Sequence, residues 1–452
     1  MNQDDLLLTG ATVVGASGAT RADVSVRDGR VSAVLPPGTL TRAREVLDLR
    51  GRFLLPGLID SHVHFRQPGL SHKEDWQHGS RAAVAGGVTT VIDMPNTDPP
   101  ANSPRRLWAK HRLIDGTSLV DYRFHAGVDP RNIDGIKEIG PREAASIKVF
   151  LSGHHTAPDV VTDPAALERL FRIAGEQDRT LIFHSEHEEI FALLDVWRGA
   201  PRTFRDYETL RPRSAGIVAT LNLIELARRS DTAAHVLHVS SREEADLLAA
   251  AACSGIPVTF EVTGHHLTFT NDDMDRLGNR IRLRPAIRDD ADRERLWEAV
   301  TEGQAATIGS DHSPHTAEEK NRPMPGAPPG LPGVQELFAT VFTGLTERLP
   351  EMDPGPRLSA VVRLMSAGPA ALFGLADRKG EIAPGRDADI VVVDPVRRHV
   401  LTNGGVFAKC GWSAYEGRPF TGGIDLTLRR GSPVYRWTPQ EHVFGKPTGI
   451  WL

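Results

Sequence analysis

The 452-residue sequence predicts an α/β fold, a TIM-type (β/α)8 barrel combined with a small composite β-sandwich domain. Three observations carry this prediction. The chain is too long for one small core, apolar strand-like runs alternate with helical patterns through its middle, and β-rich runs occur at both ends. An open doubly wound sheet would show the same alternation, but no glycine-rich dinucleotide fingerprint follows the first strand. The barrel is therefore the preferred prediction.

The two ends of the chain, residues 1–55 and 376–452, are predicted to build the small β domain together. The first segment contains the runs ATVVGA, ADVSVRDG and VSAVLPP, separated by Gly, Asp and Pro in the manner of hairpins. Similar runs return near the carboxyl end as DADIVVVDP, HVLTNGG and IDLTLRRGSPVY. We expect the two segments to share one sheet.

Residues 56–375 are predicted to form the barrel. The strand-like runs are GLIDSHVHF, TTVIDM, SIKVFLS, TLIFHSE, HVLHVS, VTFEVT and ATIGSDH. Helical patterns between them read PAALERLFRIAGEQ, IVATLNLIELARR and SREEADLLAAAACSG, the last with Ser240 or Ser241 as its N-cap. Repeated strand and helix predict parallel strands joined by crossover helices.

Composition excludes several classes of protein. A net charge of -5 gives no reason to expect nucleic acid or an anionic membrane as a partner. No apolar stretch approaches the roughly 20 residues of a membrane span, and the amino terminus lacks a secretory pattern. Cys253 and Cys410 are too few for a disulfide framework. We expect a soluble, cytoplasmic protein.

Polar side chains close several of the apolar runs, where the active site of such a barrel lies. His62 and His64 are two residues apart on one strand, so both imidazoles project from the same face and can converge on a metal ion. Alone, the pair could equally be structural. Later runs supply further candidates, and the whole set of predicted metal ligands is His62, His64, Lys148, His184, His238 and Asp311.

Lys148 and Asp311 suggest particular chemistry. Lys148 is flanked by apolar residues, so its ammonium would carry a large desolvation cost. It could snorkel to a carboxylate, or it could be a neutral amine carboxylated by carbon dioxide that bridges two metals. Asp311 could orient a water and move its proton, or it could simply cap a helix.

Seven motifs carry a family resemblance: LPGLIDSHVHFRQPG, KEDWQHGSRAAVAGGVTTVIDMPNTDPP, IKVF, FHSEHE, LHVSSREEA, GSDHSPHTAEEK and GEIAPGRDADIVVVDP. In this order they resemble the cyclic amidohydrolases, and among them the dihydroorotases, over nearly the whole chain. The resemblance implies the metal-dependent amidohydrolase form of the barrel.

The resemblance also implies a metal centre. His62, His64, Lys148 and Asp311 would hold one ion, and an N-carboxylated Lys148 with His184 and His238 would hold the other, both zinc. A hydroxide shared by the metals would attack the ring carbonyl, while Asp311 moves a proton to the departing amide nitrogen.

Substrate recognition is expected at four other positions. Arg66 follows His64 at i+2 and could grip a carboxylate bidentately, while Asn96 could add a hydrogen bond. In dihydroorotases these two contact the substrate carboxylate and His315 lines the pocket, whereas allantoinases usually lack this Arg and carry MPLN in place of MPNT. Arg284, in RLRPAIR, resembles the arginine form of the animal pyrimidine-synthesis polypeptide. It could also be a solvated surface arginine.

The implied activity is reversible hydrolysis of dihydroorotate to N-carbamoyl-L-aspartate in pyrimidine biosynthesis. Gln67 stands where an Asp is common, and SGHHTAP, with His154 and His155, replaces the usual lid sequence. These departures leave allantoin, a hydantoin or a dihydropyrimidine as alternative substrates, so an allantoinase or a hydantoinase (dihydropyrimidinase) is the alternative enzyme.

A noncatalytic scaffold partner of other pyrimidine enzymes is a further alternative, against which the complete ligand set argues. Homologues commonly pair, so we also expect a homo-oligomer, dimer or tetramer, with possible association with other enzymes of the pathway.

Overall fold

The computed structural model describes residues 3–39, 42–153, 156, 159–198, 207 and 209–452. Eight parallel strands form the barrel sheet, each paired with its neighbour in sequence. They are β8 (Leu58–Val63), β9 (Val88–Asp93), β10 (Asp121–Gly127), β11 (Ser146–Phe150), β12 (Leu181–His184), β13 (Ala234–Val236), β14 (Val258–Thr263) and β15 (Thr307–Gly309). The ring closes where Val63 bridges His312. This confirms the TIM-type prediction.

One barrel strand, β10, is missing from the seven runs that the sequence indicates. Its residues DYRFHAG mix polar and apolar side chains, yet all seven are buried. Arg123 donates to the Phe373 and Pro141 carbonyls, and His125 contacts Ser146 and the Ser61 carbonyl. Polar residues that find partners in the interior therefore hide this strand from a search for apolar runs.

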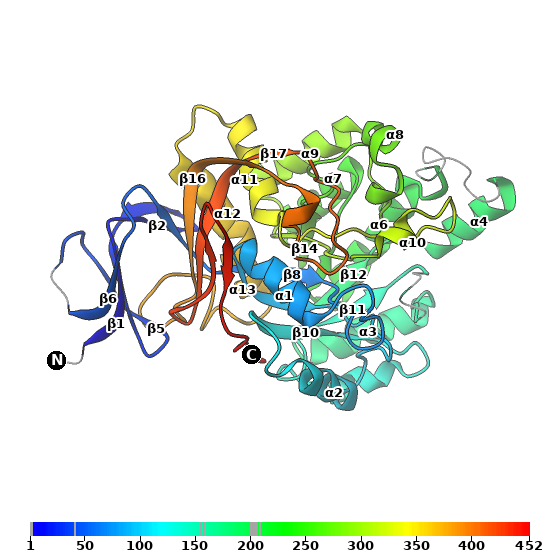
Figure 1. Cartoon of the computed structure of the whole chain (residues 1–452). Helices are drawn as coiled ribbons and strands as arrows, with labels where there is room; N and C mark the ends of the chain where they lie inside the picture. The colour runs from blue at the N-terminus through cyan, green and yellow to red at the C-terminus, as the bar shows by residue number, and fades with distance from the viewer. Residues whose placement is uncertain (1–2, 40–41, 154–155, 157–158, 199–206, 208) are drawn as a thin grey trace.

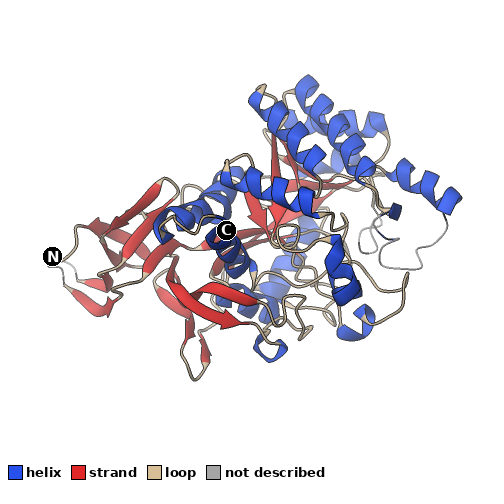
Figure 2. Cartoon of the chain, turned by 90° about the horizontal axis from the view of Figure 1, so that it is seen from above, coloured by secondary structure: helices blue, strands red, loops and turns tan. Residues whose placement is uncertain are grey.

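Helices surround the barrel strands (Figures 1 and 2). The longer ones are α1 (Trp76–Ala85), α2 (Pro104–Ile114), α3 (Pro164–Glu176), α4 (Glu188–Arg198), α6 (Arg213–Ser230), α7 (Arg242–Cys253), α9 (Asp290–Thr301), α11 (Leu337–Arg348) and α12 (Pro354–Val362). Short helices are α8 (Met274–Leu277), α10 (Ala317–Lys320) and α13 (Gly368–Leu372). No helix in this described part has the length and apolar character of a membrane span.

The three helices that the sequence predicts correspond to α3, α6 and α7. Ser241 is the N-cap of α7, where its side chain accepts from Glu244 N and the Glu244 carboxylate accepts from Ser241 N. This reciprocal pair is a capping box, which satisfies two backbone donors at the start of the helix.

A strand-rich part at the N-terminal side adjoins the barrel (Figures 1 and 2). One sheet has the order β5–β4–β1–β6, with β1 (Asp4–Thr9), β4 (Asp23–Arg27), β5 (Arg30–Leu35) and β6 (Ala43–Asp48). The other has the order β19–β18–β17–β16–β7–β2–β3, with β2 (Thr12–Gly15), β3 (Gly18–Arg21), β7 (Phe53–Pro56), β16 (Ile390–Val400), β17 (Pro419–Arg429), β18 (Ser432–Trp437) and β19 (His442–Phe444). Because β7 pairs with β16, strands from both ends of the chain share a sheet. The division at residues 55/56 and 375/376 stays a prediction.

A buried ion cluster ties β10 to the carboxyl-terminal segment. The Asp121 carboxylate accepts from Lys379 Nζ and Arg429 Nη1, both at 2.7 Å, and from Arg430 Nη1 at 2.8 Å. Lys379 also contacts Asp389 at 2.6 Å. Burial acts to raise the pKa of Asp121, but the three cations outweigh it and hold the pKa below its usual value. The carboxylate is therefore ionised and binds distant parts of the chain together.

We expect Asp121→Asn to lower the free energy of unfolding by about 3 kcal/mol, because it leaves buried cations without their shared counter-charge. Urea unfolding followed by tryptophan fluorescence measures the change. Asp48→Asn is the matched control, since Asp48 pairs with Arg50 on the exposed surface and should shift the midpoint little. Equal midpoints for the two variants would contradict the role of the cluster.

Candidate active site

A cavity of about 20 Å³ lies at the carboxyl ends of the barrel strands. Its lining includes all six predicted metal ligands. Lys148 lies in the middle of β11, and the other five lie at the end of a strand or just after it. The full lining is His62, His64, Lys148, Phe150, His184, His238, Leu283, Arg284, Asp311, Ser313, Pro329 and Gly330. Such a volume holds about one water molecule, so a ring-shaped substrate requires the lining to move.

His62, His64 and Asp311 form one group of donors. Asp311 Oδ1 lies 3.3 Å from His62 Nε2 and 3.1 Å from His64 Nε2. Burial lowers the pKa of His64 to about 3, so its imidazole is uncharged at neutral pH. Burial acts to raise the pKa of Asp311, but His62 and His64 hold it well below its usual value. Burial acts to lower the pKa of His62, but Glu261 and Asp311 raise it above its usual value, so without a cation this imidazole tends to keep both protons. Two imidazoles converging with a carboxylate fit a divalent cation, which would replace the proton on the nitrogen that faces Asp311.

His184 and His238 form a second group, with His184 Nδ1 3.1 Å from His238 Nε2. Burial lowers the pKa of both imidazoles, so neither carries a charge at neutral pH. Glu186 Oε2 lies 2.7 Å from His184 Nε2 and can only accept, which places the proton on that nitrogen. The lone pair of His184 Nδ1 therefore faces His238, as ligation of a cation between them requires.

Lys148 lies between the two groups in the cavity lining. Its side chain is 1% exposed, and its Nζ lies 4.7 Å from the centroid of the Phe150 ring. Burial lowers the pKa of Lys148 to about 7, against the opposing effect of Asp311 and Glu261. Within the described residues no carboxylate pairs with it, so the snorkelling alternative finds no support. An amine in this setting is neutral much of the time at pH 7.

Arg66 is a buried cation behind the cavity. Its side chain is 1% exposed, and its Nε and Nη1 find no hydrogen-bond partner among the described residues. Burial lowers the pKa of Arg66 to about 10, so the guanidinium stays charged at neutral pH. Unpartnered N–H groups on a buried planar cation favour an anion with two coplanar acceptors, such as a carboxylate.

His315 sits next to Arg66 with a fixed proton. Its Nε2 lies 3.0 Å from the Pro329 carbonyl oxygen, and its Nδ1 lies 3.1 Å from Lys73 Nζ. A carbonyl only accepts and an ammonium only donates, so Nε2 carries the proton. Arg66 Nη2 lies 3.5 Å from this nitrogen. Because both atoms are donors, the contact gives the guanidinium no acceptor. The sequence analysis missed Lys73 and its partner Glu319, 2.9 Å away, although both lie in quoted motifs.

Asn96 lies outside the cavity lining, whereas Arg284 belongs to it. Asn96 Oδ1 lies 2.8 Å from His64 Nδ1, and its amide donates to Thr156 Oγ1 at 2.7 Å. Asn96, like Arg66 and His315, is outside the cavity lining. Arg284 lines the cavity and donates to the Gly153 carbonyl at 2.8 Å, so it is no solvated surface arginine. His154 and His155 lie outside the described residues.

Three residues of the candidate site have strained backbone conformations. Arg66, His238 and Asp311 have φ values of 62°, 40° and 44°, in the left-handed region that non-glycine residues rarely adopt. Each such conformation costs about 1–3 kcal/mol and persists only where the surroundings enforce it. Strain at three candidate residues supports a functional role for the strand ends.

Two buried glutamates behind the histidines were also missed. Glu261 in β14 lies 2.7 Å from His62 Nδ1, and Glu186 contacts His184. Both side chains are 0% exposed. A charged residue inside the apolar run VTFEVT was the available signal, because an unpaired carboxylate is too costly to bury there.

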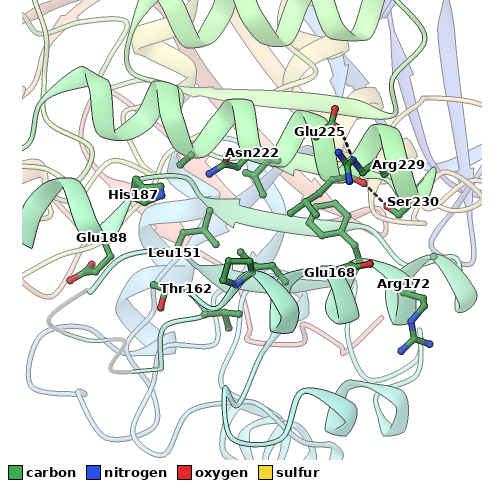
Figure 3. A pocket seen from close by; sticks show the side chains of 18 of the residues that line it. Leu151, Thr162, Glu168, Arg172, His187, Glu188, Asn222, Glu225, Arg229 and Ser230 are labelled. Carbon is green, nitrogen blue, oxygen red and sulfur yellow. Dashed lines mark hydrogen bonds and ion pairs between the residues drawn. The ribbon is translucent and has the colours of Figure 1, made fainter.

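A larger hollow of about 840 Å³ lies outside the barrel between α3 and α6 (Figure 3). Leu151, Phe171 and Leu223 line it, and rim charges pair with each other, as Arg229 does with Glu225 at 2.5 Å. None of the predicted site residues belongs to its lining. Size alone therefore does not identify the functional site.

Comparisons with known proteins agree with this geometry. The family model described as "Amidohydrolase family" matches residues 53–434. An allantoinase of Rubrobacter xylanophilus is 35% identical over 440 residues, covering 96% of this chain and 95% of that protein. A dihydroorotase of Halobacterium salinarum is 34% identical over 427 residues, covering 92% of this chain and 95% of that protein. The solved structure of an L-hydantoinase (dihydropyrimidinase) from Arthrobacter aurescens superposes with a TM-score of 0.92 at 26% identity and covers 99% of each chain.

We expect His64→Ala to weaken binding of a divalent cation at least about tenfold, because one of three converging ligands is lost. Competition with a chromophoric chelator measures the affinity of the metal-depleted protein. His78→Ala is the matched control, since His78 belongs to a partly exposed group with Glu74 and Asp75. If His78→Ala weakened cation binding and His64→Ala did not, the cation would bind at Glu74, Asp75 and His78, and the assignment to the strand ends would be wrong.

Proposed function

Since the chain belongs to the amidohydrolase family and is a hydrolase acting on cyclic amides, we propose that its substrate is dihydroorotate, hydrolysed reversibly to N-carbamoyl-L-aspartate. The single observation that carries this choice is the buried, incompletely paired guanidinium of Arg66. Dihydroorotate bears a carboxylate on its ring, whereas the rings of hydantoin and allantoin do not. A carboxylate would supply the two acceptors that Arg66 lacks.

Allantoin or a hydantoin is the alternative substrate, and the names of the relatives favour it about as well. Allantoinases of Rubrobacter xylanophilus and Streptomyces avermitilis are 35% and 33% identical to this chain, beside the 34% of the Halobacterium dihydroorotase. Overall sequence identity therefore does not indicate which of these substrates the chain hydrolyses. The noncatalytic alternative is less favoured, because competent side chains occupy all six predicted ligand positions.

For the metal centre we propose two divalent cations, zinc in each case, bridged by N-carboxylated Lys148. The donor chemistry fits, because a buried lysine lines one cavity with two groups of imidazoles and one carboxylate. Carboxylation would convert the lysine from an uncompensated cation into an anionic ligand. When bound, the cations would supply Lewis acidity and a water nucleophile of lowered pKa.

Asp311 is the residue placed to move a proton. Its neighbours keep it ionised, and it lines the cavity with the candidate ligands. We assign it the acceptance of a proton from the attacking water and its delivery to the amide nitrogen as the ring C–N bond breaks. Arg66 would hold the substrate carboxylate, and Arg284, which lines the same cavity, would contact the substrate once its bond to Gly153 is released.

Turnover of dihydroorotate, allantoin and hydantoin by the metal-loaded protein tests the substrate directly, and we expect the highest kcat/KM for dihydroorotate. Arg66→Gln should lower kcat/KM for dihydroorotate by roughly a hundredfold or more, since a charge-assisted bidentate contact is lost. The same substitution should change turnover of uncharged rings much less. An equal loss on charged and uncharged substrates, or no turnover of dihydroorotate, would exclude the proposal.

Lys148→Ala should reduce activity by about a hundredfold or more, because the proposed cations lose their shared ligand. Added acetate or propionate should restore part of it. The exposed Lys137 supplies the control Lys137→Ala, which should keep full activity.

The carboxylation itself has a pH signature. Carbon dioxide adds to the neutral amine with release of a proton, and a pKa of about 7 leaves roughly half of Lys148 neutral at pH 7. With ¹³C-bicarbonate, the carbamate signal of the metal-depleted protein should therefore fall as the pH drops below 7. A wild-type protein without any such signal, together with an unrescued variant, would rule out the bridge.

A further inference from the structure

The rear nitrogens of three candidate metal ligands each face an oxygen that only accepts. His62 Nδ1 lies 2.7 Å from Glu261 Oε1, His64 Nδ1 lies 2.8 Å from Asn96 Oδ1, and His184 Nε2 lies 2.7 Å from Glu186 Oε2. Each facing nitrogen must carry a proton, so the opposite nitrogen is the one whose lone pair can bind a cation. His62 and His64 therefore offer Nε2, whereas His184 offers Nδ1.

Glu186 is itself held in place from behind. Arg211 Nη2 donates to the same Glu186 oxygen at 2.5 Å, and the Arg211 guanidinium carbon lies 3.7 Å from the centroid of the Phe191 ring. The Arg211 carbonyl also accepts from Arg288 Nη1 at 2.7 Å. The chain Arg211–Glu186–His184 therefore supports the imidazole from behind, with all three residues buried.

Glu261 reaches the centre from β14, two strands along the sheet from β12. Its Oε1 accepts from the backbone N–H of His238 at 3.2 Å as well as facing His62. Gly309 on β15 provides the space, because a Cβ there would lie 2.5 Å from Glu261 Oε2 and 3.0 Å from His62 Cβ. A glycine at this strand end is therefore needed for the carboxylate to lie beneath His62.

We propose that Glu261 and Glu186 are positioning residues that each serve one half of the metal centre. Glu261 fixes His62 with Nε2 toward the cation held with His64 and Asp311. Glu186, supported by Arg211, fixes His184 with Nδ1 toward the cation held with His238. This inference rests on the two-cation centre proposed above, and it assigns opposite imidazole tautomers to His62 and His184.

The test measures how many divalent cations each variant retains, and how tightly, in zinc titrations at buffered free zinc. Glu186→Ala is combined with Arg211→Met, so that no buried charge is left without its partner. This double variant should bind one cation at least about tenfold more weakly and the other normally. Glu261→Ala should weaken the other cation instead. Adding His238→Ala to the Glu186/Arg211 variant should weaken that same cation further and leave the other unchanged, because both changes act on one cation.

Two comparisons separate positioning from damage to the fold. Glu186→Gln and Glu261→Gln keep an acceptor oxygen and should recover much of the affinity. Glu244→Gln is the matched control: Glu244 is also a buried glutamate, but it contacts Ser241 and no histidine, so zinc affinity should be unchanged. Equal weakening of both cations by each alanine variant, or unchanged affinity in folded protein, would overturn the assignment.

Nitrogen-15 spectra of the histidines in metal-free protein give a readout that does not depend on the two-cation proposal. We expect His184 to carry its proton on Nε2 in the wild type and to become a mixture of tautomers in the Glu186/Arg211 variant. An unchanged tautomer would overturn the role of Glu186. A wild type that binds a single cation but shows this tautomer shift would instead contradict the two-cation centre and leave the positioning role standing.

Discussion

Burial of imidazole, ammonium and carboxylate groups at one end of a closed parallel barrel is the constraint on which the site depends. Removal from water lowers the pKa of His64 and His184 and leaves them uncharged. Their neighbours nevertheless keep Asp311 ionised. The cost of this burial is offset by carboxylates behind the imidazoles and, in our proposal, by cations in front of them. The order of carboxylate, imidazole and cation follows from a need to neutralise charge without water.

Much of this site could be predicted because parallel strands bring their carboxyl ends together. When a polar residue such as His184 or Asp311 ends an apolar run, its place in the sequence therefore predicts that its side chain lies at this end of the barrel. The supporting residues do not follow that rule. Glu261 lies within a strand, and its burial is offset by His62. Asp121 lies at the start of a strand, and its burial is offset by Lys379. Both partners are far away in sequence. A single sequence contains no record of those pairings.

The predicted substrate residues show the same limit. Arg66 and Asn96 follow strands as expected, yet side-chain direction decides what they contact. Asn96 holds His64 and bonds Thr156, while Arg66 lies behind the cavity beside His315. The cavity in front of the candidate ligands has only about 20 Å³ of space, and Arg284, which lines it, bonds to the Gly153 carbonyl. The position of a residue in the sequence therefore does not by itself give its contacts in the site.

Anomalous X-ray diffraction from crystals of the metal-loaded protein, measured at the zinc absorption edge, would locate the cations themselves. We expect two peaks per chain flanking Lys148, one next to His62, His64 and Asp311 and one next to His184 and His238. Electron density for a carboxylated Lys148 should lie between them. An absence of peaks at the strand ends in metal-loaded, active protein, or peaks only at the Glu74, Asp75 and His78 group, would contradict the two-cation centre.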